Sequence, residues 1–262
     1  MKLEVLSRQP DSRTHATPLL FVHGLFLGVW CWEEHFLGYF AQHGYASYAL
    51  SLRGHGASEG RDRLRWTRMS EYVADVVQVA QQLPTPPVVI GHSNGGAVVQ
   101  EYLETHAAPA GVLLASAPPS GFLRTALRTA VKHPLLFTKS NLTMSLYPLV
   151  STPALAREFF FSAGMSEDRV RAYQAKMVDE SFLAFLDMLF LDLPRPGRVK
   201  TPMLVLGAAD DSSFHPNQVQ ATARAYGTEA FVYPAMPHAM MLEDGWQSVA
   251  DRILAWLSEK GL

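Results

Sequence analysis

Cysteine and unbalanced charge are both scarce in this chain. The 262 residues include one cysteine, Cys31, which cannot form an intrachain disulfide or a metal site built from cysteines. Lys and Arg number 22 and Asp and Glu number 24, so the formal net charge is only -2. This balance gives no reason to expect nucleic acid or an anionic membrane as a partner.

Long hydrophobic runs are missing as well. The most apolar segment, "SFLAFLDMLFLDL" at 181–193, is interrupted by Asp187 and Asp192 and is too short to cross a bilayer. The opening residues, "MKLEVLSRQPDSRTH", lack the apolar core of a signal peptide. We therefore expect a cytoplasmic protein without a membrane span.

The apolar residues are instead gathered in short runs that end in glycine or a turn signal. Their residues are consecutive rather than alternating, which is typical of strands covered on both faces, as in a parallel sheet. The runs are 18–24, 46–56, 86–93, 110–119, 202–211 and 229–238.

Helical patterns lie between these runs, at 30–43, 69–83, 97–106, 216–226 and 246–258. Strands that alternate with helices predict an α/β fold, with a doubly wound, mostly parallel sheet flanked by helices.

The alternation stops between Pro119 and Val199, where no strand pattern is found. Thr152-Pro153 and Ser166 each predict a helix start, and Leu123, Leu127 and Val131 mark another helix that ends at His133-Pro134. We therefore expect a core of residues 1–118 and 199–262, with a helical lid at 119–198 inserted between two strands.

A G-x-S-x-G sequence, Gly91-His92-Ser93-Asn94-Gly95, directly follows one of the predicted strands and precedes a helix. Such a turn is so tight that its flanking residues must be small, and it leaves the serine oxygen exposed at the edge of the sheet. Ser93 is therefore a candidate nucleophile.

A serine hydroxyl needs a base to take its proton, and the base needs an acid to orient it. His238 follows the last apolar run, at the carboxyl edge of the sheet where Ser93 also lies, and is the expected base. His92 is expected to be a packed neighbour. The acid is Asp210 or Asp211, which follow the penultimate run.

The oxyanion of an acyl-transfer intermediate also needs hydrogen-bond donors. We expect the backbone N–H of Asn94, next to the nucleophile, to be one. Leu25 is expected to supply the other, because Gly24 before it allows a close backbone approach.

With these motifs in the same order, the chain resembles the α/β-hydrolase superfamily over nearly its whole length. "HGLFLG" through "LRGHGAS", "GHSNGG", "PMLVLGAADD" and "MPHAMM" carry the resemblance. The subgroup that it most resembles is the serine carboxylesterase and lysophospholipase-like set, which has a four-helix lid. In close relatives the acid is followed by a small residue, two apolar residues and proline, a register that favours Asp211. Ser213 and Asn94 depart from the apolar residues usual at their positions.

The resemblance implies acyl transfer to water, because serine stands where haloalkane dehalogenases and epoxide hydrolases carry aspartate. Fold alone does not decide the substrate, so esters, thioesters, lactones, carbon–carbon hydrolysis and cofactor-free perhydrolysis stay open. It implies no metal and no organic cofactor.

Apolar residues are expected to form the substrate pocket. Phe26, Phe160 and Met240 are the candidates, although a stripe of Phe, Leu and Met more commonly packs a lid onto a core. Arg53, near the pocket mouth, is expected to be a structural ion-pair partner. No basic cluster converges on the motifs, so we expect a neutral, apolar small-molecule ester of short to medium chain.

The main hypothesis is a serine carboxylesterase acting through an acyl-enzyme. Two alternatives are a lipase or lysophospholipase acting at a lipid surface, and a ligand-sensing protein that retains the triad. The sequence predicts no oligomeric state.

Overall fold

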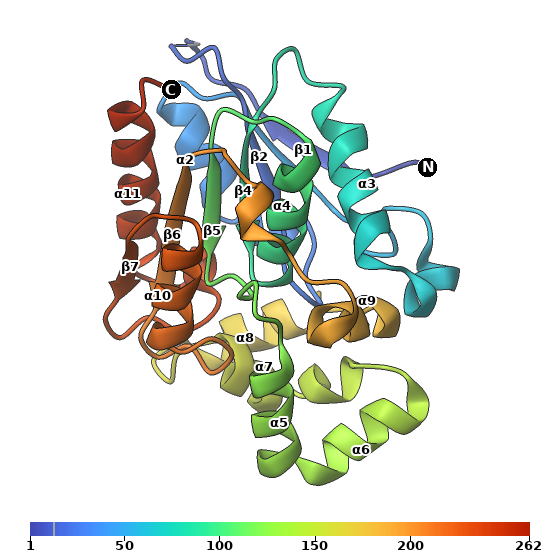
Figure 1. Cartoon of the computed structure of the whole chain (residues 1–262). Helices are drawn as coiled ribbons and strands as arrows, with labels where there is room; N and C mark the ends of the chain where they lie inside the picture. Colours follow the sequence, from blue (N-terminus) through green and yellow to red (C-terminus); the bar gives the residue numbers. More distant parts are fainter. Residues whose placement is uncertain (13) are drawn as a thin grey trace.

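The computed structural model describes residues 1–12 and 14–262 and contains one seven-stranded sheet with the strand order β1-β3-β2-β4-β5-β6-β7 (Figure 1). All neighbouring strands are parallel except β1, which runs antiparallel to β3. The strands are β1 (Val5–Arg8), β2 (Leu19–Val22), β3 (Ser47–Leu50), β4 (Val88–His92), β5 (Gly111–Leu114), β6 (Met203–Ala208) and β7 (Ala230–Tyr233).

The six strands predicted from apolar runs are all present, which confirms the doubly wound, mostly parallel sheet. Every residue of β2, β4, β5 and β6 is buried, as expected for strands covered on both faces. Strand β1 was not predicted, because it is a mostly exposed edge strand of the sequence "VLSR" that has no apolar run.

Helices cover both faces of the sheet. On one face α4 and α10 pack against the strands, with α3 beside α4, and on the other face lie α2 and α11 (Figure 1). The core helices are α1 (Trp30–Glu33), α2 (Phe36–Gln42), α3 (Met69–Ala80), α4 (Asn94–Thr105), α10 (Pro216–Ala225) and α11 (Trp246–Glu259). The single helix expected at 30–43 is therefore divided into α1 and α2.

Between β5 and β6 the chain forms helices and no strand, and these lie at the carboxyl edge of the sheet (Figure 1); we call this segment the insertion. Its α-helices are α5 (Leu123–Lys132), α6 (Pro134–Thr143), α7 (Pro153–Phe160), α8 (Glu167–Gln174) and α9 (Phe182–Leu186), and a π-helical turn, η3 (Asp187–Leu191), continues α9. The helix starts predicted from Thr152-Pro153 and Ser166 are correct, because each hydroxyl accepts a bond from the first helical turn.

A buried carboxylate holds the end of the insertion to the core. Asp187 accepts hydrogen bonds from Arg68 Nε at 2.8 Å and Nη2 at 2.6 Å, and from the backbone N–H of Met69 at 3.0 Å. Met69 begins α3, so the carboxylate also lies at the positive end of that helix. The acidic residue that interrupts the apolar run 181–193 therefore joins two parts of the chain.

Among the described residues, no helix is long and apolar enough to span a bilayer.

Backbone contact at Gly95 brings α4 close to β2. A Cβ atom at this position would overlap the carbonyl oxygens of Val22, the last residue of β2, and His23, the residue after it. Gly38, within α2, has no atom of the described residues, apart from its own helix backbone, within 4 Å of the place where its Cβ would lie. The two glycines therefore provide a matched pair, one packed against backbone and one with free space.

We predict that Gly95→Ala lowers the free energy of unfolding by at least about 3 kcal/mol, because rigid backbone must move to admit the methyl group. Gly38→Ala should instead raise it by about 0.5–1 kcal/mol, since alanine is the better helix former. Chemical denaturation of both variants measures the difference. Equal effects of the two substitutions would contradict the close approach at Gly95.

Candidate active site

Ser93 occupies a strained turn between β4 and α4. Its backbone angles are φ 53° and ψ -119°, a region that residues with a side chain rarely adopt. Three backbone bonds fix this geometry: Ser93 N–H donates to Leu114 O, and Ser93 O accepts from the N–H groups of Gly96 and Ala117. The turn is thus held on one side by β5 and on the other by the start of α4.

The structure brings Ser93, His238 and Asp211 into a continuous hydrogen-bonded chain. Ser93 Oγ lies 2.9 Å from His238 Nε2, and His238 Nδ1 lies 2.8 Å from Asp211 Oδ2. All three side chains are buried. The residues come from three loops, after β4, β6 and β7, that meet because parallel strands end at the same edge.

Asp211, and not Asp210, contacts the histidine. Its Oδ1 accepts the backbone N–H groups of Ser213 at 2.7 Å and Phe214 at 3.0 Å, which leaves Oδ2 directed at His238. Asp210 is exposed. The preference for Asp211 therefore agrees with the geometry, although Ser213 departs from the apolar residue usual at its position.

His92 holds the loop that carries His238, a contact that the sequence did not predict. Its Nε2 donates to the carbonyl oxygen of His238 at 3.0 Å, and its ring is fully buried. Burial, followed by the nearby charge of His238, lowers the pKa of His92 well below its ordinary value. His92 is thus a neutral hydrogen-bond donor that positions the histidine backbone.

His23 performs a similar task for the loop that contains Leu25. Leu52 N–H donates to His23 Nε2, so the proton lies on Nδ1, which donates to Gly24 O at 2.8 Å. Burial, and then the charge of His55, lowers the pKa of His23 to about 3, so the ring stays neutral. Gly24 O and Leu25 N–H belong to one trans peptide and point in opposite directions, so the bond to His23 orients the Leu25 N–H.

Gly24 lies against the serine, as expected. A Cβ on Gly24 would be 2.7 Å from Ser93 Cβ and 2.9 Å from His92 Nδ1, too close for any other residue. Asn94 is the first residue of α4, where backbone N–H groups have no partner within the helix. The two backbone groups expected to bind an oxyanion thus lie on the two segments that adjoin Ser93.

A cavity of about 50 Å³ opens beside Ser93 and His238. Phe26 and Phe160 line it, as the sequence analysis expected. Met240 does not line it: this side chain is fully buried in a short 3₁₀-helix (Met240–Leu242) that packs against α11. The other lining residues, none of them charged, are Leu25, Phe122, Thr125, Thr129, Leu146, Leu149, Phe159, Phe185 and Ser213.

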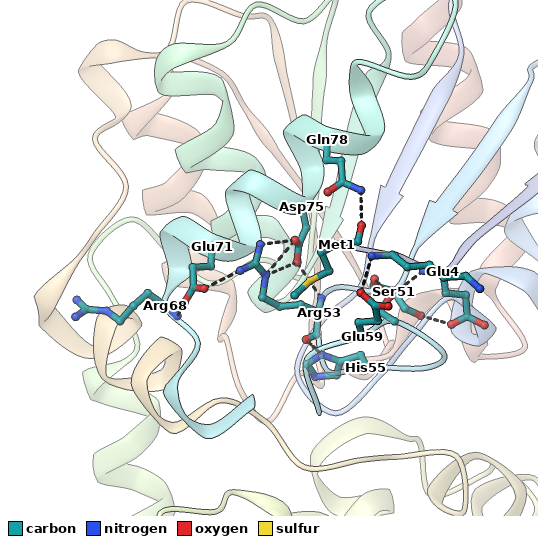
Figure 2. Close-up of polar contacts among 12 residues, drawn as sticks. Met1, Glu4, Ser51, Arg53, His55, Glu59, Arg68, Glu71, Asp75 and Gln78 are labelled. Atoms are coloured by element: carbon teal, nitrogen blue, oxygen red, sulfur yellow. Dashed lines mark hydrogen bonds and ion pairs between the residues drawn. The ribbon is translucent and has the colours of Figure 1, made fainter. Parts of the chain in front are cut away.

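Arg53 is occupied by two carboxylates. Its guanidinium donates to Asp75 through Nε and Nη2, and Nη1 lies 2.7 Å from Glu71 Oε1 (Figure 2). The expected structural ion-pair role of Arg53 thus matches its contacts.

A buried ion pair between His55 and Glu180 joins the core to the insertion. His55 Nδ1 donates to Arg53 O at 3.1 Å, and its Nε2 lies 3.2 Å from Glu180 Oε2. Glu180 Oε1 also accepts from Tyr72 at 2.6 Å. Burial opposes both charges, but each partner outweighs it, so the pKa of His55 is raised and that of Glu180 is lowered.

Comparison with known proteins finds one family, and the similar proteins are named for different activities. A model of the alpha/beta hydrolase family matches residues 19–252. A non-heme chloroperoxidase from Burkholderia pyrrocinia is 37% identical over 114 residues, which cover 40% of this chain and 38% of that protein. The aligned part thus spans well under half of this curated relative.

Solved structures superpose on nearly the whole chain. Because their sequence identities are low, they show the fold alone. A provisionally assigned non-heme bromoperoxidase from Mycobacterium tuberculosis superposes with a TM-score of 0.80 at 18% identity, covering 99% of this chain and 97% of that one. An esterase from Exiguobacterium antarcticum gives a TM-score of 0.76 at 17% identity, covering 98% and 95%.

We predict that Ser93→Gly raises the free energy of unfolding by about 1 kcal/mol, because glycine adopts this backbone geometry without strain. Ser93→Ala removes the same hydroxyl but keeps a Cβ atom, so it should give no such gain. Urea denaturation of the two variants separates backbone strain from loss of the hydroxyl. A Ser93→Ala variant as stable as Ser93→Gly would refute strain at this residue.

We also predict that the stability contributed by the His55–Glu180 pair declines in alkali. Because the folded-state pKa of His55 lies above its ordinary 6.5, this contribution is complete below pH 6.5 and is lost as the pH rises through the folded-state value. The stability difference between the wild type and His55→Gln should therefore shrink as the pH is raised above 6.5 and through the folded-state pKa. Denaturant titrations at each pH test this; a constant difference would exclude a charged His55.

Proposed function

The chain belongs to the alpha/beta hydrolase family, and we propose that it is a serine-dependent hydrolase of apolar carboxylic esters with short to medium acyl chains. The observation that carries the proposal is the hydrogen-bonded chain from Ser93 through His238 to Asp211 beside an uncharged cavity.

In the first half of the reaction, His238 Nε2 takes the proton of Ser93 as the serine oxygen attacks the ester carbonyl. The carbonyl oxygen becomes an oxyanion, which the N–H groups of Asn94 and Leu25 stabilise. The carbonyl then re-forms and the bond to the alcohol breaks. His238 gives its proton to the leaving alcohol, and the acyl group remains on Ser93.

In the second half, His238 takes a proton from water as the water oxygen attacks the acyl-enzyme. The bond to Ser93 breaks, His238 returns the proton to the serine oxygen, and the carboxylic acid leaves. Throughout, Asp211 Oδ2 holds the Nδ1 proton and stabilises the imidazolium; its Oδ1 is occupied by two backbone N–H groups, so the carboxylate cannot rotate freely.

The cavity supports a small, apolar acyl group. Its volume is about 50 Å³, and its uncharged lining does not suit a phosphate or a second carboxylate. A second cavity of about 30 Å³ adjoins it and shares five of its lining residues, Phe122, Thr129, Leu146, Leu149 and Phe185. Movement of these shared side chains would join the cavities and admit a medium chain.

We predict a maximum rate on the acetate or butyrate among p-nitrophenyl acetate, butyrate, octanoate and palmitate. Ser93→Ala should lower turnover on the order of a million-fold, as loss of a triad nucleophile does elsewhere. Asp210→Asn, one residue from the proposed acid but exposed, is the matched control for Asp211→Asn and should keep the wild-type rate.

Retention of most of the activity by Ser93→Ala would end the proposal, and a rate confined to the palmitate would favour a lipase.

The relative named as a non-heme chloroperoxidase favours a second candidate. Hydrogen peroxide could attack the acyl-enzyme in place of water, releasing a peracid and restoring the Ser93 hydroxyl. Bromide oxidation in the presence of ester and hydrogen peroxide would reveal this activity. It should be absent from Ser93→Ala; oxidation that persists without the serine would exclude this route.

A further inference from the structure

The most exposed large apolar side chains among the described residues gather on two helices of the insertion. Val131 and Leu135 are each 84% exposed and Leu142 is 80% exposed. Leu123 and Leu127 are also exposed, and their four-residue spacing to Val131 puts all three on one side of α5. We call residues 123–143, which comprise α5 and α6, the α5–α6 hairpin; it projects farthest from the sheet (Figure 1).

The exposed side of α5 is more apolar than the side that it turns towards the protein. The buried residues of α5 are Thr125 and Ala126, whereas the leucines and the valine face outwards. A helix that only covered a core would show the opposite arrangement. The outward stripe is therefore suited to contact with another apolar phase.

All charged residues of the hairpin carry the same sign. Arg124, Arg128, Lys132 and Lys139 lie between residues 123 and 143, and no Asp or Glu occurs from 105 to 157. Lys132 pairs with Glu158 at 3.0 Å, and Arg128 donates to Ser213 O. Arg124 and Lys139 are exposed and form no ion pair within the described part of the chain.

We propose that the α5–α6 hairpin is a docking surface for an anionic lipid bilayer, on which the protein lies peripherally. Leucine and valine side chains enter the interface between headgroups and acyl chains, while the basic side chains contact anionic headgroups. No membrane-spanning helix is needed, because only single side chains of the hairpin enter the bilayer. The proposal does not depend on the proposed ester hydrolysis.

The charge of the hairpin favours an anionic bilayer over a second copy of the chain as its partner. In a symmetric dimer through this surface, each basic hairpin would face another basic hairpin. A bilayer that contains anionic lipid supplies the opposite sign over the whole contact.

Docking would place the proposed substrate cavity next to the bilayer. Phe122, at the start of α5, and Thr125 and Thr129, on its inner side, line the cavity beside Ser93. The same helix thus has one side against the cavity and the other in the proposed interface. Apolar compounds dissolved in the membrane would be concentrated near the helix that covers the site.

The test is co-sedimentation of the full-length Ser93→Ala protein with vesicles, so that no hydrolysis can alter the result. We expect binding to vesicles of phosphatidylcholine and phosphatidylglycerol in equal parts, and at least about tenfold weaker binding to pure phosphatidylcholine. Raised salt should weaken the binding, because it screens the attraction.

Two sets of variants on the same background locate the surface. Leu135→Asp with Leu142→Asp, and separately Lys139→Glu, should each weaken binding to the mixed vesicles by at least about tenfold. Phe231→Asp is the matched control, because Phe231 is an exposed apolar residue on the edge strand β7, outside the insertion, and should leave binding unchanged. All four positions are exposed, and circular dichroism verifies that each variant folds.

Three results would overturn the proposal. The protein could fail to sediment with the mixed vesicles, or the hairpin variants could bind as well as the Phe231→Asp control. In analytical ultracentrifugation without lipid, a dimer that Leu135→Asp with Leu142→Asp converts to a monomer would assign the exposed surface of the α5–α6 hairpin to a second copy of the chain.

Discussion

The rest of the site depends on the tight turn at Ser93, where backbone from three strands meets with no room for side chains. Ser93 is held with a positive φ by bonds to β5 and α4, while Gly24 and Gly95 let the loop after β2 and the start of α4 approach it. Because β4, β6 and β7 are parallel, the loops after them meet at this edge and bring Asp211 and His238 to the serine. The strain at one residue is thus maintained by the whole sheet.

Much of this arrangement can be predicted because it is local in the sequence. Buried parallel strands need consecutive apolar residues, and a tight strand-to-helix turn needs small residues, so six strands and the position of Ser93 follow from short patterns. The order of Ser93, Asp211 and His238 adds one long-range expectation, and the three side chains lie within hydrogen-bonding distance because parallel strands share an edge. Strand β1 could not be found in this way, because its exposed residues carry no apolar signal and its pairing with β3 depends on tertiary context.

The contacts that sequence patterns could not supply are those between side chains and distant backbone. His92 was expected to be only a packed neighbour and His23 carried no prediction, yet each is buried and neutral and holds one carbonyl group, of Gly24 or of His238. Met240 had the right chemistry for a pocket, but it lies in a turn that points into the core. Residue type therefore predicted which groups could act, and only the packing decided which of them reach Ser93.

The α5–α6 hairpin shows why averages over a whole chain can mislead. A net charge of -2 gave no reason to expect an anionic surface as a partner, but every acidic residue lies outside 105–157 and leaves the hairpin wholly basic. Likewise, the spacing of Leu123, Leu127 and Val131 predicted a helix correctly, and the usual interpretation would bury that stripe. In the fold the stripe faces outwards, because Thr125 and Thr129 on the other side line the cavity next to Ser93. One helix thereby links the proposed chemistry to the proposed membrane contact: its inner side limits the space for the acyl group, and its outer side determines where the protein would meet its substrate.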